Sequence, residues 1–141
     1  MDGAAGEDRE LRAGLRLEVV ALRSRGRGTP VPALHAGRPG GARETYVAGH
    51  AFGRALDHAL RTEVAGALLE RALRRSPTPA LWLSRGRVPQ WHDDDAAWFG
   101  PVVAAYGELG LPPRFLVVTP RGWYDPRTGR VRTWRRPRIR T

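Results

Sequence analysis

Two short apolar runs separated by one helical segment constrain the fold of this chain most strongly. Residues 80–83 (Ala-Leu-Trp-Leu) and 114–119 (Arg-Phe-Leu-Val-Val-Thr) have the composition of buried strands. Between them, residues 93–109 begin with three aspartates, which favour a helix N-terminus, and continue with apolar side chains at helical spacing. This order predicts a parallel strand pair joined by a right-handed crossover. Pro101 is expected to kink the helix or delay its start.

The remaining segments add a second helix and further strands around this unit. The clearest helix is predicted over residues 51–75, where apolar residues repeat every four positions before a Pro-rich stop. A hairpin is predicted over residues 122–134, because an Asp-Pro-Arg-Thr-Gly sequence supplies its turn. Further strands are expected at residues 15–22, which begin with apolar–polar alternation, and at 29–35, which two prolines restrict to a sheet edge. Residues 43–47 could form another short strand, which is not counted in the order of elements below.

Together these elements predict an α/β (α+β) fold with a single three-layer domain. We expect a mixed sheet of about five strands with two main helices, in the order β-β-α-β-α-β-β. The globular domain is expected at residues 13–134, between a flexible acidic N-terminus (1–12) and a basic C-terminal tail (135–141). Since the chain has no apolar run of membrane-spanning length and no signal-peptide pattern, we expect a cytoplasmic protein without a membrane partner.

Composition excludes several chemistries and limits the argument from charge. The chain of 141 residues has no cysteine, which excludes disulfides, thiolate nucleophiles and Cys-ligated zinc. Its net charge is +10, which favours acidic partners or nucleic acid. All 24 basic residues are arginines, and lysine and asparagine are absent, as expected from a very GC-rich genome. The placement of the arginines is therefore more informative than their number.

The C-terminal hairpin and tail concentrate this charge. Residues 121–141 contain eight arginines and one acid, so they carry seven of the ten net charges. Strand alternation places Arg130, Arg132, Trp134 and Arg136 on one face and Val131, Thr133 and Arg135 on the other. A face that mixes Arg with Trp suits phosphate contacts and base stacking; alternatively, it is a solvated face with Trp134 folded over the core. The predicted residues for binding nucleic acid or an acidic protein surface are Arg121, Trp123, Arg130, Arg132, Trp134, Arg135, Arg136, Arg138 and Arg140.

The acidic cluster His92, Asp93, Asp94 and Asp95 has two interpretations. These side chains could bind a divalent cation, with Arg85 and Arg87 holding a phosphate. Acids at a helix N-terminus more simply cap the helix, and we favour capping and predict no metal or cofactor. Ser84 receives no catalytic role, because there is no nucleophile elbow and no identifiable base in the sequence.

Residues 49–52 (Gly-His-Ala-Phe) follow the first predicted strands and lie at the start of the first predicted helix. In element order and in this His-Ala pair the chain resembles the cytidine-deaminase-like superfold, which includes JAMM-type metalloproteases and RadC-like proteins. Phe52 stands where that family's proton-shuttling Glu should be, and residues 84–95 contain no Cys. The resemblance therefore implies a member without a zinc site. Residues 81–85, 93–98 and 117–129 also resemble small uncharacterised proteins of GC-rich bacteria, a likeness that implies no activity.

Three functions follow as hypotheses. The leading one is a non-catalytic binding or adaptor domain whose basic C-terminal hairpin contacts nucleic acid or an acidic partner. The second is a metal-dependent hydrolase or nucleotide-modifying enzyme of deaminase-like fold. The third is a structural subunit whose apolar surface is built from Trp82, Trp91, Trp98 and Trp123.

Overall fold

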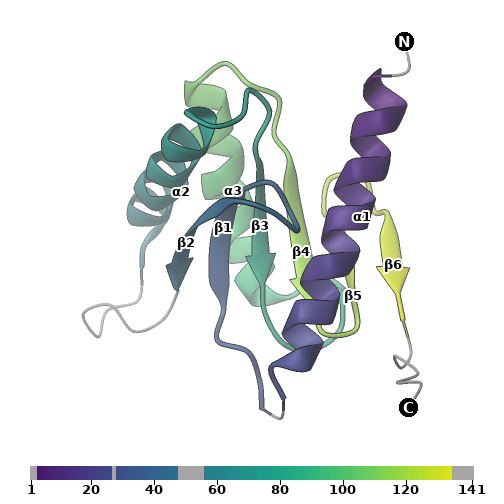
Figure 1. Ribbon diagram of the computed structural model, residues 1–141. Helices are drawn as coiled ribbons and strands as arrows, with labels where there is room; N and C mark the ends of the chain where they lie inside the picture. The colour runs from purple at the N-terminus through teal and green to yellow at the C-terminus, as the bar shows by residue number, and fades with distance from the viewer. Residues whose placement is uncertain (1–2, 27, 48–55, 135–141) are drawn as a thin grey trace.

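A mixed six-stranded sheet forms the centre of the molecule (Figure 1). The computed structural model describes residues 3–26, 28–47 and 56–134. The strand order is β2-β1-β3-β4-β5-β6. Strands β3 (Ala80–Ser84) and β4 (Phe115–Thr119) are parallel and are connected through α3 (Asp93–Glu108), while all other neighbours are antiparallel. The predicted strand–helix–strand unit is confirmed, and the sheet has one strand more than expected.

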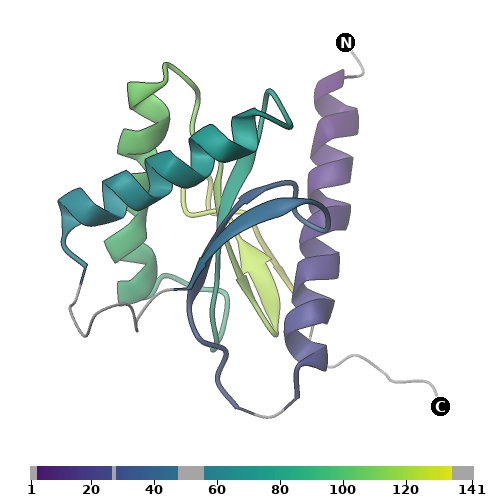
Figure 2. The ribbon, with the colours of Figure 1, turned by 60° about the vertical axis from the view of Figure 1, so that its left-hand side comes forward.

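Helices cover both faces of the sheet, which gives the predicted three layers (Figure 2). Helices α2 (His58–Leu73) and α3 lie on one face, and α1 (Gly3–Ser24) lies on the other. Every residue of β3 and β4 is buried, as a strand pair covered on both sides requires. The α/β class is thus confirmed, with three helices rather than two among the described residues. None of these helices is both long enough and apolar enough to cross a membrane.

Helix α1 replaces the strand predicted at residues 15–22, so that prediction is wrong. Leu15, Val19 and Leu22 are buried against the sheet, and their spacing of four and three residues fits a helix. Leu17, which strand alternation would bury with Leu15 and Val19, is 58% exposed. The helix begins at Gly3, so it also includes most of residues 1–12, which were expected to be flexible.

The strand predicted at residues 29–35 is shifted and is not at an edge. Strand β1 (Ala33–Gly37) lies between β2 (Arg43–Val47) and β3. Both prolines, Pro30 and Pro32, precede β1, so they remove no hydrogen bond from the ladder. The short strand predicted at 43–47 is confirmed as β2, which forms one edge of the sheet.

Helix α2 is shorter than predicted. It begins at His58, because Asp57 has extended backbone angles and its carboxylate accepts a hydrogen bond from the Leu60 N–H, 2.8 Å away. Residues 51–55 of the predicted helix lie outside the described residues. Helix α3 has nearly the predicted bounds and contains the buried Pro101 near its middle, so this proline does not delay its start.

The C-terminal hairpin is confirmed. Strands β5 (Gly122–Tyr124) and β6 (Val131–Thr133) are antiparallel, with Trp123 opposite Arg132 and Tyr124 opposite Val131. The turn between them is closed by a 2.8 Å hydrogen bond from the Gly129 N–H to the Asp125 carbonyl. Gly129 has φ 79°, the left-handed conformation that favours glycine at this position. Strand β6 forms the second edge of the sheet.

Helix α1 is fixed to the β1–β2 loop by charge and by close packing. The buried Glu18 carboxylate accepts hydrogen bonds from two guanidinium nitrogens of Arg43 and from the Gly40 N–H. These contacts hold the pKa of Glu18 below its usual value although burial alone would raise it. The helix approaches so closely at Gly14 that a side chain there would overlap the Pro39 carbonyl oxygen.

Truncating two leucines of α1 tests this helical register. Leu15 is fully buried, so Leu15→Ala should lower the free energy of unfolding by about 2–5 kcal/mol. Leu17→Ala removes the same atoms from a mostly exposed site and should change stability by less than about 1 kcal/mol. Urea unfolding followed by circular dichroism measures both values. Equal losses for the two variants would support the strand alternation instead.

Candidate functional site

An arginine-lined groove separates α1 from the C-terminal hairpin. Its volume is about 300 Å³, and we call it the arginine groove. One wall belongs to α1 and the other to β5, β6 and the residue that follows β6, so segments from opposite ends of the chain form it. The lining residues are Arg9, Arg12, Ala13 and Arg16 of the helix and Trp123, Arg132 and Trp134 of the hairpin.

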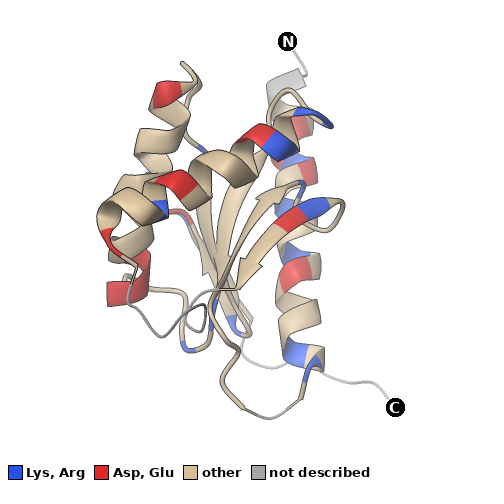
Figure 3. Cartoon of the chain, turned by 90° about the vertical axis from the view of Figure 1, so that its left-hand side faces the viewer, with Lys and Arg blue, Asp and Glu red and all other residues tan. Residues whose placement is uncertain are grey.

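Basic and acidic residues are interspersed along α1, as Figure 3 shows. Arg9, Arg12 and Arg16 recur at three- and four-residue spacing and therefore share one face. Two acids of the helix pair away from this face: Glu18 with Arg43, and Glu7 with Arg114 at 3.5 Å. Asp8 pairs with Arg12 of this face. Among the residues that the structure describes, none of those lining the groove is acidic, so the lining carries a net positive charge.

Two contacts hold the hairpin beside α1. Asp8 lies 3.1 Å from both Arg12 and Arg130, and the hydrogen bond from Arg130 lowers the pKa of Asp8. Farther along the helix, the Arg23 guanidinium donates to the Trp134 carbonyl over 3.1 Å. Among the described residues, no ion pair engages Arg9, Arg16 or Arg132. The groove therefore keeps most of its cationic groups available.

The two tryptophans of the groove differ in exposure. Trp123 is 5% exposed and belongs to the core beneath α1. Trp134 is half-buried and packs against the same core, while the Arg132 guanidinium carbon lies 5.7 Å from its ring centre. Trp134 thus combines both interpretations of the sequence, because it covers the core and keeps part of its ring at the groove.

Arg132 faces away from Val131 and Thr133, as strand alternation predicted, and it lies on the side of Trp123 and α1. Arg130 also reaches α1, although its guanidinium is bound to Asp8. Arg121 lies in the turn before β5 and lines a different cavity, so it is not part of the groove. The predicted residues Arg135, Arg136, Arg138 and Arg140 lie outside the described residues. The sequence reasoning missed the arginines of α1, because their segment was predicted to be flexible or a strand.

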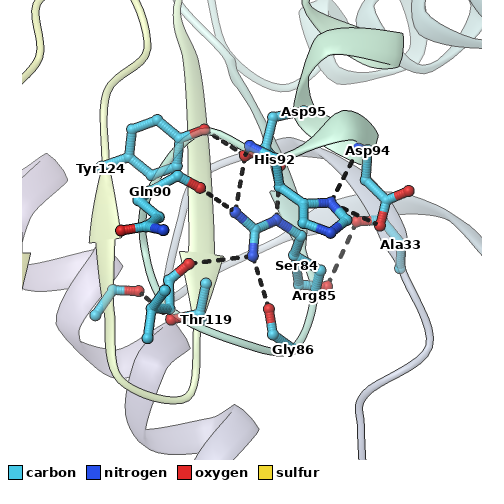
Figure 4. A network of polar contacts seen from close by, with 12 residues as sticks. Ala33, Ser84, Arg85, Gly86, Gln90, His92, Asp94, Asp95, Thr119 and Tyr124 are labelled. Atoms are coloured by element: carbon cyan, nitrogen blue, oxygen red, sulfur yellow. Dashed lines mark hydrogen bonds and ion pairs between the residues drawn. The ribbon is translucent and has the colours of Figure 1, made fainter.

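The acidic cluster is a helix cap joined to a buried ion pair (Figure 4). Asp95 is fully buried, and its oxygens accept hydrogen bonds from Arg85 at 2.6 and 2.8 Å and from the Tyr124 hydroxyl. Asp95 also accepts from the His92 N–H, and the two residues form a capping box. The capping interpretation is confirmed for Asp95, although the N-cap residue is His92 rather than an aspartate.

The same contacts leave no carboxylate cluster for a cation. His92 accepts a hydrogen bond from the Asp94 N–H at 3.1 Å, and Asp93 is exposed. No three His, Asp or Glu side chains within the described ranges are placed to hold a metal ion. Nor is Arg85 free for a phosphate, since it is 2% exposed and also donates to the carbonyls of residues 86, 88 and 90. Burial alone would lower the pKa of Arg85, but Asp95 outweighs burial and raises it.

A histidine and two hydroxyl groups form a second polar cluster, on the α1 face of the sheet. His35 Nε2 lies 2.8 Å from Ser84 Oγ, and His35 Nδ1 lies 2.8 Å from Thr45 Oγ1. The ring stacks on Trp82 with 5.2 Å between centres. Burial, with a smaller effect from Arg43, lowers the pKa of His35 to about 4. His35 is therefore a base beside Ser84 that the sequence did not reveal. At 5% and 7% exposure, however, Ser84 and His35 are enclosed, and together with Thr45 they link three strands.

The four tryptophans proposed to form one apolar surface are dispersed. Trp82 and Trp123 are buried beneath α1, whereas Trp98 belongs to α3 and is buried in the core on the other face of the sheet. Trp91 alone of the four is exposed. Burial in two separate cores explains why these side chains do not form a common surface.

Comparisons of this chain with models of known protein families, with curated proteins and with solved structures gave no match. The two resemblances therefore stay predictions. Residues 49–52, which carry the His-Ala pair, lie outside the described residues.

The depressed pKa of His35 makes stability depend on pH. The native state resists protonation down to about pH 4, whereas the unfolded chain takes up the proton near pH 6.5. Stability is therefore highest above the unfolded pKa and should fall by up to about 3 kcal/mol as the pH drops from 6.5 to 4. Urea unfolding at several pH values should show a flatter profile for His35→Gln. The exposed His58→Gln variant should retain the wild-type slope, and a wild-type slope in His35→Gln would contradict the assignment.

Removing one charge of the buried ion pair should be costly. Asp95→Asn leaves the Arg85 guanidinium buried without its counter-charge, so we expect a loss of about 3–5 kcal/mol in urea unfolding. Asp93→Asn, at an exposed position of the same helix turn, should cost less than about 1 kcal/mol. If Mg²⁺ raised the melting temperature of the wild type and Asp95→Asn abolished that rise, Asp95 would be a metal ligand instead.

Proposed function

We propose that this protein is a non-catalytic nucleic-acid-binding domain that holds a single strand in the arginine groove. One observation carries the proposal: three arginines of α1 and one of β6 converge on one groove, and its lining within the described residues contains no acidic side chain. A predicted cytoplasmic location and the absence of a cofactor belong to the same proposal.

The groove suits the chemistry of a nucleic-acid backbone. Guanidinium groups bind phosphate oxygens in bidentate geometry, and four of them line the two walls. We propose that one sugar–phosphate chain lies in this recess between the helix and the strand. The exposed part of the Trp134 ring offers a surface on which one base can stack. Arginine contacts of this kind give affinity without reading sequence.

An acidic protein surface is the competing partner, because it presents the same sign of charge. The tryptophan ring distinguishes the two, since base stacking contributes about 1–3 kcal/mol per base and a carboxylate gains nothing comparable. No described contact favours the metal-dependent hydrolase or nucleotide-modifying enzyme, whose expected carboxylate Asp95 is bound to Arg85.

Salt dependence of binding tests the proposal. With four phosphate contacts, the affinity for a labelled mixed-sequence single strand should fall with salt at a log–log slope of about −3. Arg16→Gln and Arg132→Gln should each weaken binding and reduce the slope by about 0.7. Fluorescence anisotropy at several salt concentrations measures both quantities.

Matched controls separate this groove from the overall positive charge. Arg71→Gln removes one exposed arginine from α2, on the other side of the sheet, and should leave the slope nearly unchanged. Trp134→Leu should weaken single-strand binding but not binding of a polyglutamate peptide. Absence of binding at low salt, or equal losses for Arg71→Gln and Arg16→Gln, would refute the proposal.

A further inference from the structure

A second, larger cavity lies on the opposite side of the C-terminal hairpin. Its volume is about 580 Å³, within the usual range of small-molecule sites. Val131 and Thr133 point to this side of β6, away from Arg132, and Tyr124 belongs to the core beneath α2 and α3. We call it the hairpin cavity. Its lining residues are Val88, Pro89, Gln90, Arg121, Tyr124, Gly129, Val131, Thr133 and Trp134.

The buried Arg85 fixes one wall of this cavity. Its guanidinium donates to the carbonyls of Gly86 (2.7 Å), Val88 (3.2 Å) and Gln90 (2.8 Å), as Figure 4 shows in part. The loop over residues 86–90 is therefore held from beneath by a side chain that is itself paired with Asp95. A wall held in this way is preorganised, so binding of a ligand costs little conformational entropy in this loop.

Two further features point to the same place. Arg87, in the centre of that loop, has φ 72° and is the sole non-glycine residue with positive φ in the described chain. Such backbone strain costs roughly 1–3 kcal/mol and clusters at functional sites. Tyr124 also lines the cavity, and its hydroxyl donates a hydrogen bond to Asp95. Asp95 therefore binds both Tyr124 and Arg85, the residue that holds the loop over residues 86–90.

The lining defines the ligand chemistry. Val88 and Val131 are 38% and 56% exposed, and together with Pro89 and the rings of Tyr124 and Trp134 they form an apolar enclosure. Among the described lining residues, Arg121 is the one that is charged, and none is acidic. We propose that the hairpin cavity binds a small organic anion: an apolar, preferably aromatic body between Val88 and Val131, with a carboxylate or phosphate at Arg121. This cavity lies on the other side of β6 from the arginine groove, and Trp134 is the one described residue that lines both.

A matched pair of probes tests this site. Naphthalene-2-carboxylate and naphthalene-2-methanol share an aromatic body and differ in charge, and 2-naphthyl phosphate compares the two anionic groups. Titrations followed by amide NMR should shift residues 88–90, 121–124 and 129–133, and the anions should bind on the order of tenfold more tightly than the alcohol. Arg121→Gln should abolish that difference while leaving the weak binding of the alcohol unchanged.

The controls make each outcome decisive. Arg71→Gln, distant on α2, should retain the full preference for the anions. Val131→Asp places a negative charge on the exposed apolar wall and should weaken the anions more than the alcohol. Equal affinity for charged and neutral probes, no binding at millimolar concentration, or shifts confined to residues 9–16 would each overturn the proposal. The last result would place the anions in the arginine groove, so the two proposals fail separately.

Discussion

Burial of β3 and β4 on both faces is the constraint on which the rest of the structure depends. A parallel pair whose residues are all buried needs cover on two sides. The crossover through α3, joined by α2, covers one side, so another element has to cover the other. Helix α1 meets this requirement with Leu15, Val19 and Leu22, and its position against the hairpin creates the arginine groove.

The elements predicted correctly have signals within a few residues. An apolar run identifies β3 and β4, and an Asp-Pro-Arg-Thr-Gly turn identifies the β5–β6 hairpin. Helix α1 was missed because Leu15, Leu17 and Val19 alternate like a strand over a short window. When Leu11 and Leu22 are included, the apolar residues follow the helical period. The second face of the sheet also needs cover, which a helix provides and an additional strand does not. With that helix, Arg9, Arg12 and Arg16 fall on one face.

The candidate sites were predictable where they follow from strand alternation. Alternation separates Arg132 from Val131 and Thr133, and the two cavities on either side of the hairpin follow from it. Arg121 occupies a turn, where strand alternation does not apply. It was predicted to share a binding surface with Arg132, but it lines the hairpin cavity and Arg132 lines the arginine groove. The ion pair of Asp95 with Arg85 could not be predicted from neighbouring residues. A loop separates Arg85 from α3, and Arg85 reaches Asp95 because it directly follows the end of β3.

Gly14 shows how the dimensions of a site can depend on a residue outside it. Close approach of α1 to the Pro39 carbonyl leaves no space for even a methyl group at position 14. Any side chain there would lift this part of the helix from the β1–β2 loop and alter the separation between Arg12 or Arg16 and the hairpin. Gly14 contributes no atom to the groove lining, yet its lack of a side chain lets α1 lie close to the β1–β2 loop. The width of the groove therefore depends on the absence of a side chain at position 14. A search for binding residues by charge or aromaticity would overlook Gly14.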